Sequence, residues 1–331
     1  MSYPTDLPLL FQKYPQLKER IPWMSLGDFP TPVGQLAGLG GALGFDSLWI
    51  KQDGGSNKVR KLEYLLADAK RRGCNTLFAV GPTGSNHVRA TAVYGNAAGF
   101  AVHCLLFDQP HTDYLESNFN AISAHADRIK QVTHWGPVIL GYEYLKQCCF
   151  NSGYRYLIAP GGSSPLGCLG YVNAAFELKA QIEAGMLPEP KLIFVALGTC
   201  GTMAGLVVGA RLAGLGSRII GVRVVGRLMG NQWRIARLAR RTVRLIDRSG
   251  NTSFSWEGVP TPDTLWHHDF GRGYAIPTEG SLQAVQLMRD REGIGLENTY
   301  TGKALAGLIR YVETYRCEEQ PILFWNTYGE I

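Results

Sequence analysis

The chain has 331 residues, a formal net charge of +6 and 45% hydrophobic residues. This length is enough for two lobes that share one active site. No apolar run approaches the ~18 residues of a membrane span and no nucleic-acid-binding motif is present, so we expect neither a membrane nor a nucleic-acid partner. The cysteines show no CxxC pair and no Cys/His metal spacing. We therefore expect no metal and a reduced, cytoplasmic protein.

Short apolar runs rich in β-branched residues alternate with longer helical patterns along the chain. This alternation predicts an α/β fold with mostly parallel sheets flanked by helices. We expect strands at 47–51, 76–81, 101–107, 155–160, 191–198, 218–226 and 321–326. We expect helices at 57–73, 85–99, 169–185, 234–248 and 301–316.

The helical pattern at 57–73 begins with three positive charges, Lys58, Arg60 and Lys61. Positive side chains at a helix start oppose the positive end of the helix dipole, which prefers an anion. Lys58 and Lys61 are three residues apart, so they lie on one helix face and can address the same ligand. The pattern predicts a bound phosphate, and the alternative is a pair of surface lysines.

Glycine-rich turns follow predicted strands at 79–92, 159–171 and 196–209. In the first, Ser85, Asn86 and His87 stand at a helix N-terminus, where free N–H groups favour a carboxylate or another anion. The turn at 198–202 combines glycines with two threonine hydroxyls, which suits a phosphate. Each turn alone could simply join a strand to a helix. The standard ATP, NAD, serine-hydrolase and zinc-protease motifs are absent.

The segment 234–248 carries an arginine every three or four residues. This spacing predicts one solvent-facing stripe, with apolar residues of the same helix facing inward. The stripe is either a solvated helix face or a surface for an acidic partner. Its arginines are Arg234, Arg237, Arg241, Arg244 and Arg248.

The sequence resembles the pyridoxal-phosphate-dependent enzymes of the tryptophan synthase β-like group, fold type II. Within it, the chain is similar to the 1-aminocyclopropane-1-carboxylate deaminase and D-cysteine desulfhydrase family. The motifs that carry the resemblance occur in family order along nearly the whole chain. They are FPTPV, IKQD, NKVRKLEYLL, GSNHVRATA, GGSSPLGCLGY, GTCGTMAGLVVG, GYAIPTEGSLQAV and YTGKALAGLI.

The resemblance implies a two-lobed fold with pyridoxal 5'-phosphate between the lobes. The smaller lobe is expected at 57–169, and the larger, cofactor-binding lobe is formed by 1–56 and 170–331. It further implies that Lys58 forms the Schiff base with the cofactor and later removes the Cα proton of the substrate. Lys61 is expected beside the cofactor phosphate.

The other site residues are also carried over by motif. Asn86 is expected at the cofactor's ring hydroxyl, and Ser85, His87 and neighbouring N–H groups at the substrate carboxylate. Tyr274 and Tyr300 are expected to flank ring and substrate, although both could be core aromatics. The phosphate is expected in the turn formed by Gly198, Thr199, Cys200, Gly201 and Thr202.

One position discriminates within the family. Thr301 stands where the desulfhydrase pattern has a hydroxyl near the pyridine nitrogen and the cyclopropane deaminase pattern has glutamate. Thr327, on the substrate side, also matches the desulfhydrases. A hydroxyl leaves the ring mostly neutral and the electron sink weaker, which suits β-elimination of a good leaving group such as a thiol of pKa ~8.5.

The sequence thus predicts a lyase of amino-acid metabolism that deaminates a small amino acid to a keto acid, ammonia and the β-leaving group. It is expected to be a homodimer. The alternatives are cyclopropane ring opening, β-replacement, racemisation, or a protein that binds the cofactor without turnover. The pattern departs from the family in the short loop before Lys58, at Thr83 and Gly84, and at Asn326 and Tyr328. These departures bear on the substrate more than on the cofactor.

Overall fold

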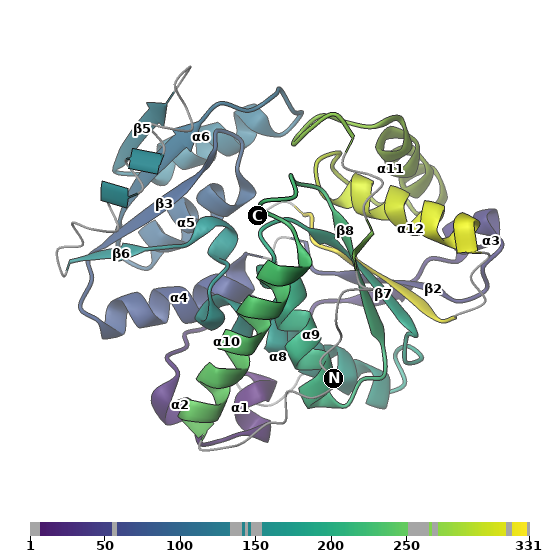
Figure 1. Cartoon of the computed structure of the whole chain (residues 1–331), viewed down its shortest axis with the longest axis horizontal. Coiled ribbons are helices and arrows are strands. Elements are labelled where there is room, and N and C mark those ends of the chain that lie inside the picture. Colours follow the sequence, from purple (N-terminus) through teal and green to yellow (C-terminus); the bar gives the residue numbers. More distant parts are fainter. Residues whose placement is uncertain are drawn as a thin grey trace.

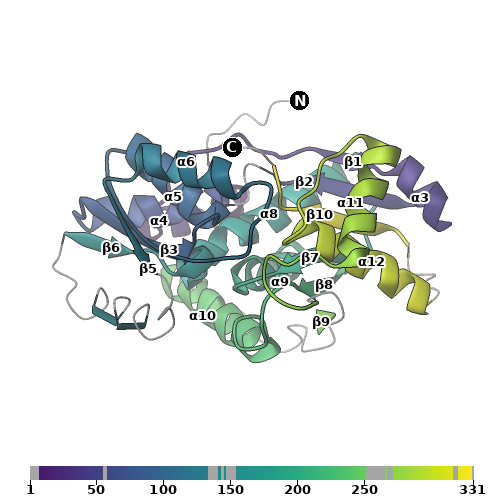
Figure 2. The same cartoon turned by 90° about the horizontal axis from the view of Figure 1, so that it is seen from above.

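The computed structural model describes residues 7–54, 58–132, 141–142, 145–146, 154–250, 265–266, 271–315 and 320–329. Two sheets lie at opposite ends of the long axis of the molecule (Figures 1 and 2). All their strand pairs are parallel except β1 with β2. The α/β fold with mostly parallel sheets is confirmed.

The larger sheet has six strands in the order β1-β2-β10-β7-β8-β9. Side chains of the central strand β7 alternate between two cores, and all are buried. This burial explains why the strand reads as a continuous apolar run, since helices cover both faces of a parallel sheet. The strands are β1 (Val33–Gln35), β2 (Leu48–Gln52), β7 (Leu192–Leu197), β8 (Arg218–Arg223), β9 (Leu265–Trp266) and β10 (Ile322–Asn326).

The smaller sheet has the order β5-β4-β3-β6. Its strands are β3 (Thr76–Pro82), β4 (Ala101–Phe107), β5 (Arg128–Val132) and β6 (Arg155–Leu157). They all fall within the expected smaller lobe, and the strands of the larger sheet all fall outside it. The boundaries at 57 and 169 stay a prediction.

Helices cover the two faces of the larger sheet with separate apolar cores. One core joins β7 and β10 to α8, α9 and α10, and the other joins them to α3, α11 and α12. A third core packs α4 and α5 on the smaller sheet. The helices are α1 (Leu9–Lys13), α2 (Leu17–Arg20), α3 (Ala37–Leu43), α4 (Val59–Arg71), α5 (Asn86–Ala97), α6 (Leu115–His125), the 3-10 turn η1 (Pro160–Gly162), α8 (Pro165–Glu183), α9 (Gly201–Ala213), α10 (Gln232–Gly250), α11 (Glu279–Glu292) and α12 (Thr301–Tyr315).

Each predicted strand and helix is present, and most of them have shifted ends. The run at 155–160 stops being a strand at Leu157 and continues as η1. Helix α8 begins four residues before the expected 169, because Ser164 caps it and Pro165 occupies its first position. The predicted arginine stripe on α10 is exposed, and Ile235 and Val243 of the same helix are buried. In the part of the chain described, no helix is both long and apolar enough to cross a bilayer.

Candidate active site

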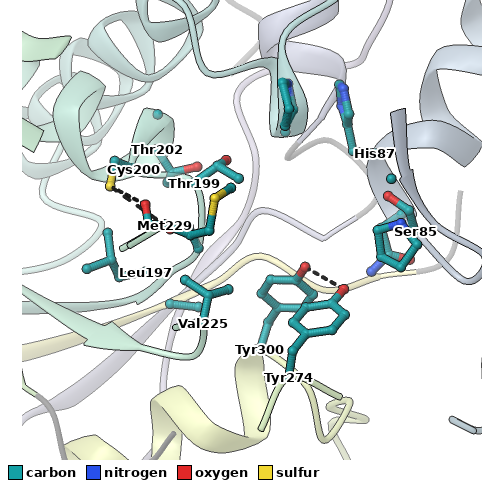
Figure 3. Close-up of a pocket in the computed structure, with 18 of the residues that line it drawn as sticks. Ser85, His87, Leu197, Thr199, Cys200, Thr202, Val225, Met229, Tyr274 and Tyr300 are labelled. Atoms are coloured by element: carbon teal, nitrogen blue, oxygen red, sulfur yellow. Dashed lines mark hydrogen bonds between the residues drawn. The ribbon is translucent and has the colours of Figure 1, made fainter. Parts of the chain in front are cut away.

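A cavity of about 620 Å³ is lined by residues at the carboxyl ends of strands from both sheets (Figure 3). Ligands in parallel α/β folds bind at this edge, where the glycine turns lead into helices. The structure brings nearly all predicted site residues to its wall. They are Lys58, Lys61, Ser85, Asn86, His87, Gly198, Thr199, Cys200, Gly201, Thr202, Tyr274, Tyr300 and Thr327.

Two lysines at the start of α4 reach the cavity. Burial lowers the pKa of Lys58 to about 8, an effect that the charge of Glu297 opposes. Burial and the charge of Lys58 lower the pKa of Lys61 to about 7. The Nζ atom of Lys61 donates to the carbonyl oxygen of Gly161 at 2.9 Å. The positive charge of Lys58 disfavours charge on the buried Lys61, and an anion in the cavity would relieve this repulsion.

His87 supplies a polar atom that lacks a partner. The ring is 5% exposed, and within the described residues its Nε2 atom makes no hydrogen bond. Burial, together with the charges of Lys58 and Lys61, lowers the pKa of His87 to about 3, so the ring is neutral. A buried polar atom without a partner is costly, which indicates that a ligand supplies the missing contact.

The start of α5 places Ser85 and Asn86 on the same wall. Ser85 caps the helix by accepting from the backbone N–H of Val88 at 3.3 Å. The Oδ1 atom of Asn86 accepts from Nδ2 of Asn118 at 2.7 Å, and that same nitrogen donates to the carbonyl of Gly84 at 2.8 Å. The amide oxygen of Asn86 is therefore held, and its N–H₂ group is the donor that remains for a ligand.

The turn between β7 and α9 has the geometry of an anion cradle. Cys200 takes a left-handed conformation with φ of 72°, and α9 begins at the next residue. A Cβ atom at Gly201 would lie 3.0 Å from Nζ of Lys61, so glycine keeps this space open. Backbone N–H groups at a helix start together with a lysine suit a phosphate.

Ser163 completes this turn, and the sequence alone did not single it out. Its Oγ atom accepts from the backbone N–H of Gly201 at 3.1 Å and lies 2.7 Å from Oγ1 of Thr199. The glycine-rich turn at 159–171 was the available signal, since it has the same strand, turn and helix plan. The contact itself requires the two turns to meet in space.

Tyr274 and Tyr300 face each other at the cavity (Figure 3). Their hydroxyl oxygens are 2.9 Å apart, and their rings pack edge to face with centroids 5.9 Å apart. Burial raises the pKa of both hydroxyls, so both keep their protons. One hydroxyl therefore donates its proton to the other. Both side chains line the cavity and are not confined to the core.

Thr301 is fully buried and is not among the residues that line the cavity. Its hydroxyl lies 3.2 Å from Oε1 of Glu297, which does line the cavity. The carboxylate of Glu297 also accepts backbone N–H groups at the start of α12, from Thr299, Tyr300 and Thr301 at 2.6–3.0 Å. Burial raises the pKa of Glu297. Glu297 was not predicted, although an acidic residue near a helix start is favoured by the helix dipole.

The departures from the family pattern are distributed unevenly. Of these positions, Tyr328 lines the cavity beside Thr327, and Asn326 is buried. Asn326 donates to Gln52 at 3.1 Å and accepts from the backbone N–H of Tyr328 at 3.0 Å, so it holds the segment in place. Thr83 and Gly84 are not lining residues. Positions 55–57 of the short loop lie outside the described residues.

A buried ion network links α4 to β2, to the residue that follows β2 and to α8. Arg60 donates to Asp53 at 2.6 Å and to Glu177 at 2.9 Å, and Lys51 donates to Glu177 at 2.7 Å. Tyr171 donates to the other carboxylate oxygen of Asp53 at 2.9 Å. The network anchors the helix that carries the cavity lysines, and it engages Lys51 away from the cavity.

The cavity presents two lysine amines beside an anion-binding turn, which suits a phosphate-bearing cofactor that can be held covalently by a lysine. The sequence profile of the family "Pyridoxal-phosphate dependent enzyme" matches residues 24–327, and the chain belongs to this family. Its cofactor is pyridoxal 5'-phosphate. Among the residues that the structure describes, no cluster of His, Cys, Asp and Glu could hold a metal ion.

The chain is D-cysteine desulfhydrase-like in sequence. It is 36% identical over 326 residues to the D-cysteine desulfhydrase of Klebsiella pneumoniae (strain 342), with 94% of each chain covered. It is 34% identical to a D-cysteine desulfhydrase from another strain of that species. The crystal structure of an ACC deaminase homologue superimposes with a TM-score of 0.80 at 28% identity, covering 98% of this chain and 95% of that one.

Replacing Thr202 with valine is expected to weaken cofactor affinity by about 1.5–3 kcal/mol, the range for a hydrogen bond to a charged group. Thr202 lines the cavity at the start of α9, where the phosphate is predicted. The measurement is cofactor titration of the apoenzyme. Thr76→Val, at the start of β3 and outside the cavity, is the control. Unchanged affinity in Thr202→Val would count against the turn as the phosphate site.

Proposed function

We propose that this enzyme is a lyase that performs α,β-elimination on a small amino acid, with D-cysteine as the first candidate. The products from D-cysteine are pyruvate, sulfide and ammonia. The observation that carries the proposal is the placement of Lys58 and Lys61 in one cavity with the turn 198–202. The similarity to D-cysteine desulfhydrases supports the choice of substrate.

The residues present fit the cofactor. Lys58 would hold it covalently, and Lys61 with the turn 198–202 would hold its phosphate. The N–H₂ group of Asn86 would donate to its ring hydroxyl. When bound, pyridoxal 5'-phosphate supplies an electron-withdrawing ring that stabilises negative charge on the substrate carbon.

The chain's own groups move the protons. Because its pKa is lowered to about 8, Lys58 has an appreciable neutral fraction near neutral pH, which suits a general base for the Cα proton. The start of α5, with Ser85 and His87, orients the substrate carboxylate. The protonated pair Tyr274 and Tyr300 provides a proton beside the reacting group.

We favour elimination over ring opening because Thr301 places an uncharged hydroxyl where the pyridine nitrogen is expected. A hydroxyl there supplies no full charge to the pyridine nitrogen, so the ring withdraws electrons less strongly. Expulsion of a thiolate, the conjugate base of an acid of pKa ~8.5, needs less help than cleavage of a carbon–carbon bond. Glu297 places a carboxyl group next to Thr301, and burial raises the pKa of that group.

Comparing kcat/KM for D-cysteine, L-cysteine and 1-aminocyclopropane-1-carboxylate tests this choice. The wild type is expected to prefer D-cysteine, and Thr301→Glu to shift the ratio toward the cyclopropane substrate. Thr301→Ser keeps the hydroxyl and is expected to leave the ratio unchanged. A wild-type preference for the cyclopropane substrate, or a ratio that Thr301→Glu does not move, would show that Thr301 does not set the reaction.

Assays with a wider panel of D- and L-amino acids distinguish elimination from the alternative functions. Conversion of one enantiomer of an amino acid to the other indicates racemisation, and transfer of an added nucleophile indicates β-replacement. A yellow protein that turns over no substrate in a full panel of D- and L-amino acids indicates cofactor binding without catalysis.

We also propose that the protein is a homodimer in the cytoplasm. Within the described residues, Cys104, Cys168 and Cys200 form no disulfide, which supports a reducing compartment. Light scattering of the purified protein tests the dimer, and a mass that corresponds to one chain would reject it. Fractionation of cells from the source organism tests the compartment, and recovery outside the cytoplasm would reject it.

A further inference from the structure

A second, smaller cavity of about 130 Å³ lies against the cofactor turn, on a side that the proposed reaction does not use. One wall is formed by Arg234, Arg237 and Arg241 of α10. The facing residues are Ser163, Thr199 and Cys200. Thr199 and Cys200 also line the large cavity, so a single turn separates the two spaces.

The arginine wall concentrates positive charge. The spacing of three and four residues places Arg234, Arg237 and Arg241 on one helix face. Within the described ranges, none of the three forms a salt bridge. Arg234 also lies in the first turn of α10, where the positive end of the helix dipole adds to its charge.

Arg234 and Cys200 both line the cavity, and the charge of Arg234 acts on the thiol of Cys200. Arg237 stacks over the ring of Trp233, with its Cζ atom 5.2 Å from the ring centroid. This stacking orients the guanidinium and leaves its edge N–H groups for a ligand.

The opposite wall offers hydroxyl groups. The Oγ atom of Ser163 and the Oγ1 atom of Thr199 are 2.7 Å apart, and either can donate to the other. Both side chains line the small cavity together with the three arginines. Guanidinium groups pair with tetrahedral oxyanions through two parallel N–H bonds, and hydroxyls complete such sites.

We propose that this cavity is a second anion site, which binds one phosphate-sized oxyanion separately from the cofactor phosphate. The volume accommodates one tetrahedral group and is far smaller than the large cavity, so a free oxyanion or the phosphate group of a small metabolite is the ligand class. Anion binding would thus be the role of the N-terminal half of the arginine stripe, which is otherwise a solvated helix face.

Titration of the holoenzyme with inorganic phosphate by calorimetry tests the site, because the bound cofactor already fills its own phosphate position. The double variant Arg237→Gln with Arg241→Gln is expected to weaken phosphate binding by about tenfold or more. Arg240→Gln with Arg244→Gln is the matched control. It removes the same charge from exposed positions of the same helix that do not line the cavity, and it is expected to leave the affinity unchanged.

Several outcomes would overturn the proposal. One is an absence of phosphate binding by the holoenzyme, and another is equal weakening in both double variants, which would indicate only a general response to charge. Competition of phosphate with the cofactor, with no binding once the cofactor is saturating, would assign the phosphate to the large cavity instead. Visible absorbance of the bound cofactor in each variant checks that the fold is intact.

Discussion

Replacing Lys58 with alanine is expected to lower kcat for D-cysteine by at least about 10²–10⁴-fold, the usual contribution of a positioned general base. The expectation rests on the position of Lys58 at the start of α4, its place on the cavity wall and its lowered pKa. The loss is expected to exceed this range, because the same nitrogen also holds the cofactor. The measurement is steady-state release of pyruvate at saturating cofactor.

Two variants of the same helix provide the comparison. Lys70→Ala removes an exposed lysine near the end of α4 and is expected to keep wild-type activity. Lys61→Ala is expected to lower cofactor affinity and to regain part of its activity when cofactor is added in excess. If Lys58→Ala retained near-wild-type kcat, the assignment of the catalytic base would be wrong.

Replacing Glu177 with glutamine is expected to lower the free energy of unfolding by about 3–5 kcal/mol, as for breaking a buried ion pair from one side. Glu177 is 3% exposed and pairs with both Arg60 and Lys51, so its loss leaves two buried cations undercompensated. Glu183→Gln, on the same helix and 66% exposed, is the control and is expected to change stability by less than about 0.5 kcal/mol. Urea unfolding followed by fluorescence measures both.

The ion pairs of Glu177 also predict how the stability of the protein depends on pH. The charges of Arg60 and Lys51 outweigh the effect of burial and lower the pKa of Glu177 from 4.5 to about 2. A lowered pKa means that the stabilisation is fully present above about pH 4.5 and is lost as the pH falls toward 2. The stability gap between wild type and Glu177→Gln should therefore narrow on acidification. A gap that does not change with pH would show that the charge of Glu177 is not its source.

Much of the fold could be predicted from local patterns, because buried parallel strands read as apolar runs. Strand β4 was predicted with its observed ends. Strand β1 has three residues and no apolar run, and β5 is largely exposed and polar, so neither produced a signal. The early start of α8 depends on a cap at Ser164, which a search for apolar periodicity overlooks.

The site was predictable where a motif places a residue at the end of a strand or the start of a helix. Ser163 and Glu297 were missed because their roles depend on contacts with Gly201 and with the start of α12. For Thr301, the motif gave the position in the chain. In the structure the residue is fully buried against Glu297 and does not line the cavity. Its predicted contact with the cofactor ring therefore remains to be tested in the bound enzyme.

The central claim is that Lys58 carries the cofactor, and reductive trapping tests it most directly. The holoenzyme is treated with borohydride, digested, and the peptide bearing the pyridoxyl group is identified by mass spectrometry. We predict the label on Lys58. Lys61 is held by the carbonyl of Gly161 beside the anion turn, and Lys51 is engaged by Glu177 in the buried network. A label on Lys51 or Lys61 would contradict the assignment and the mechanism derived from it.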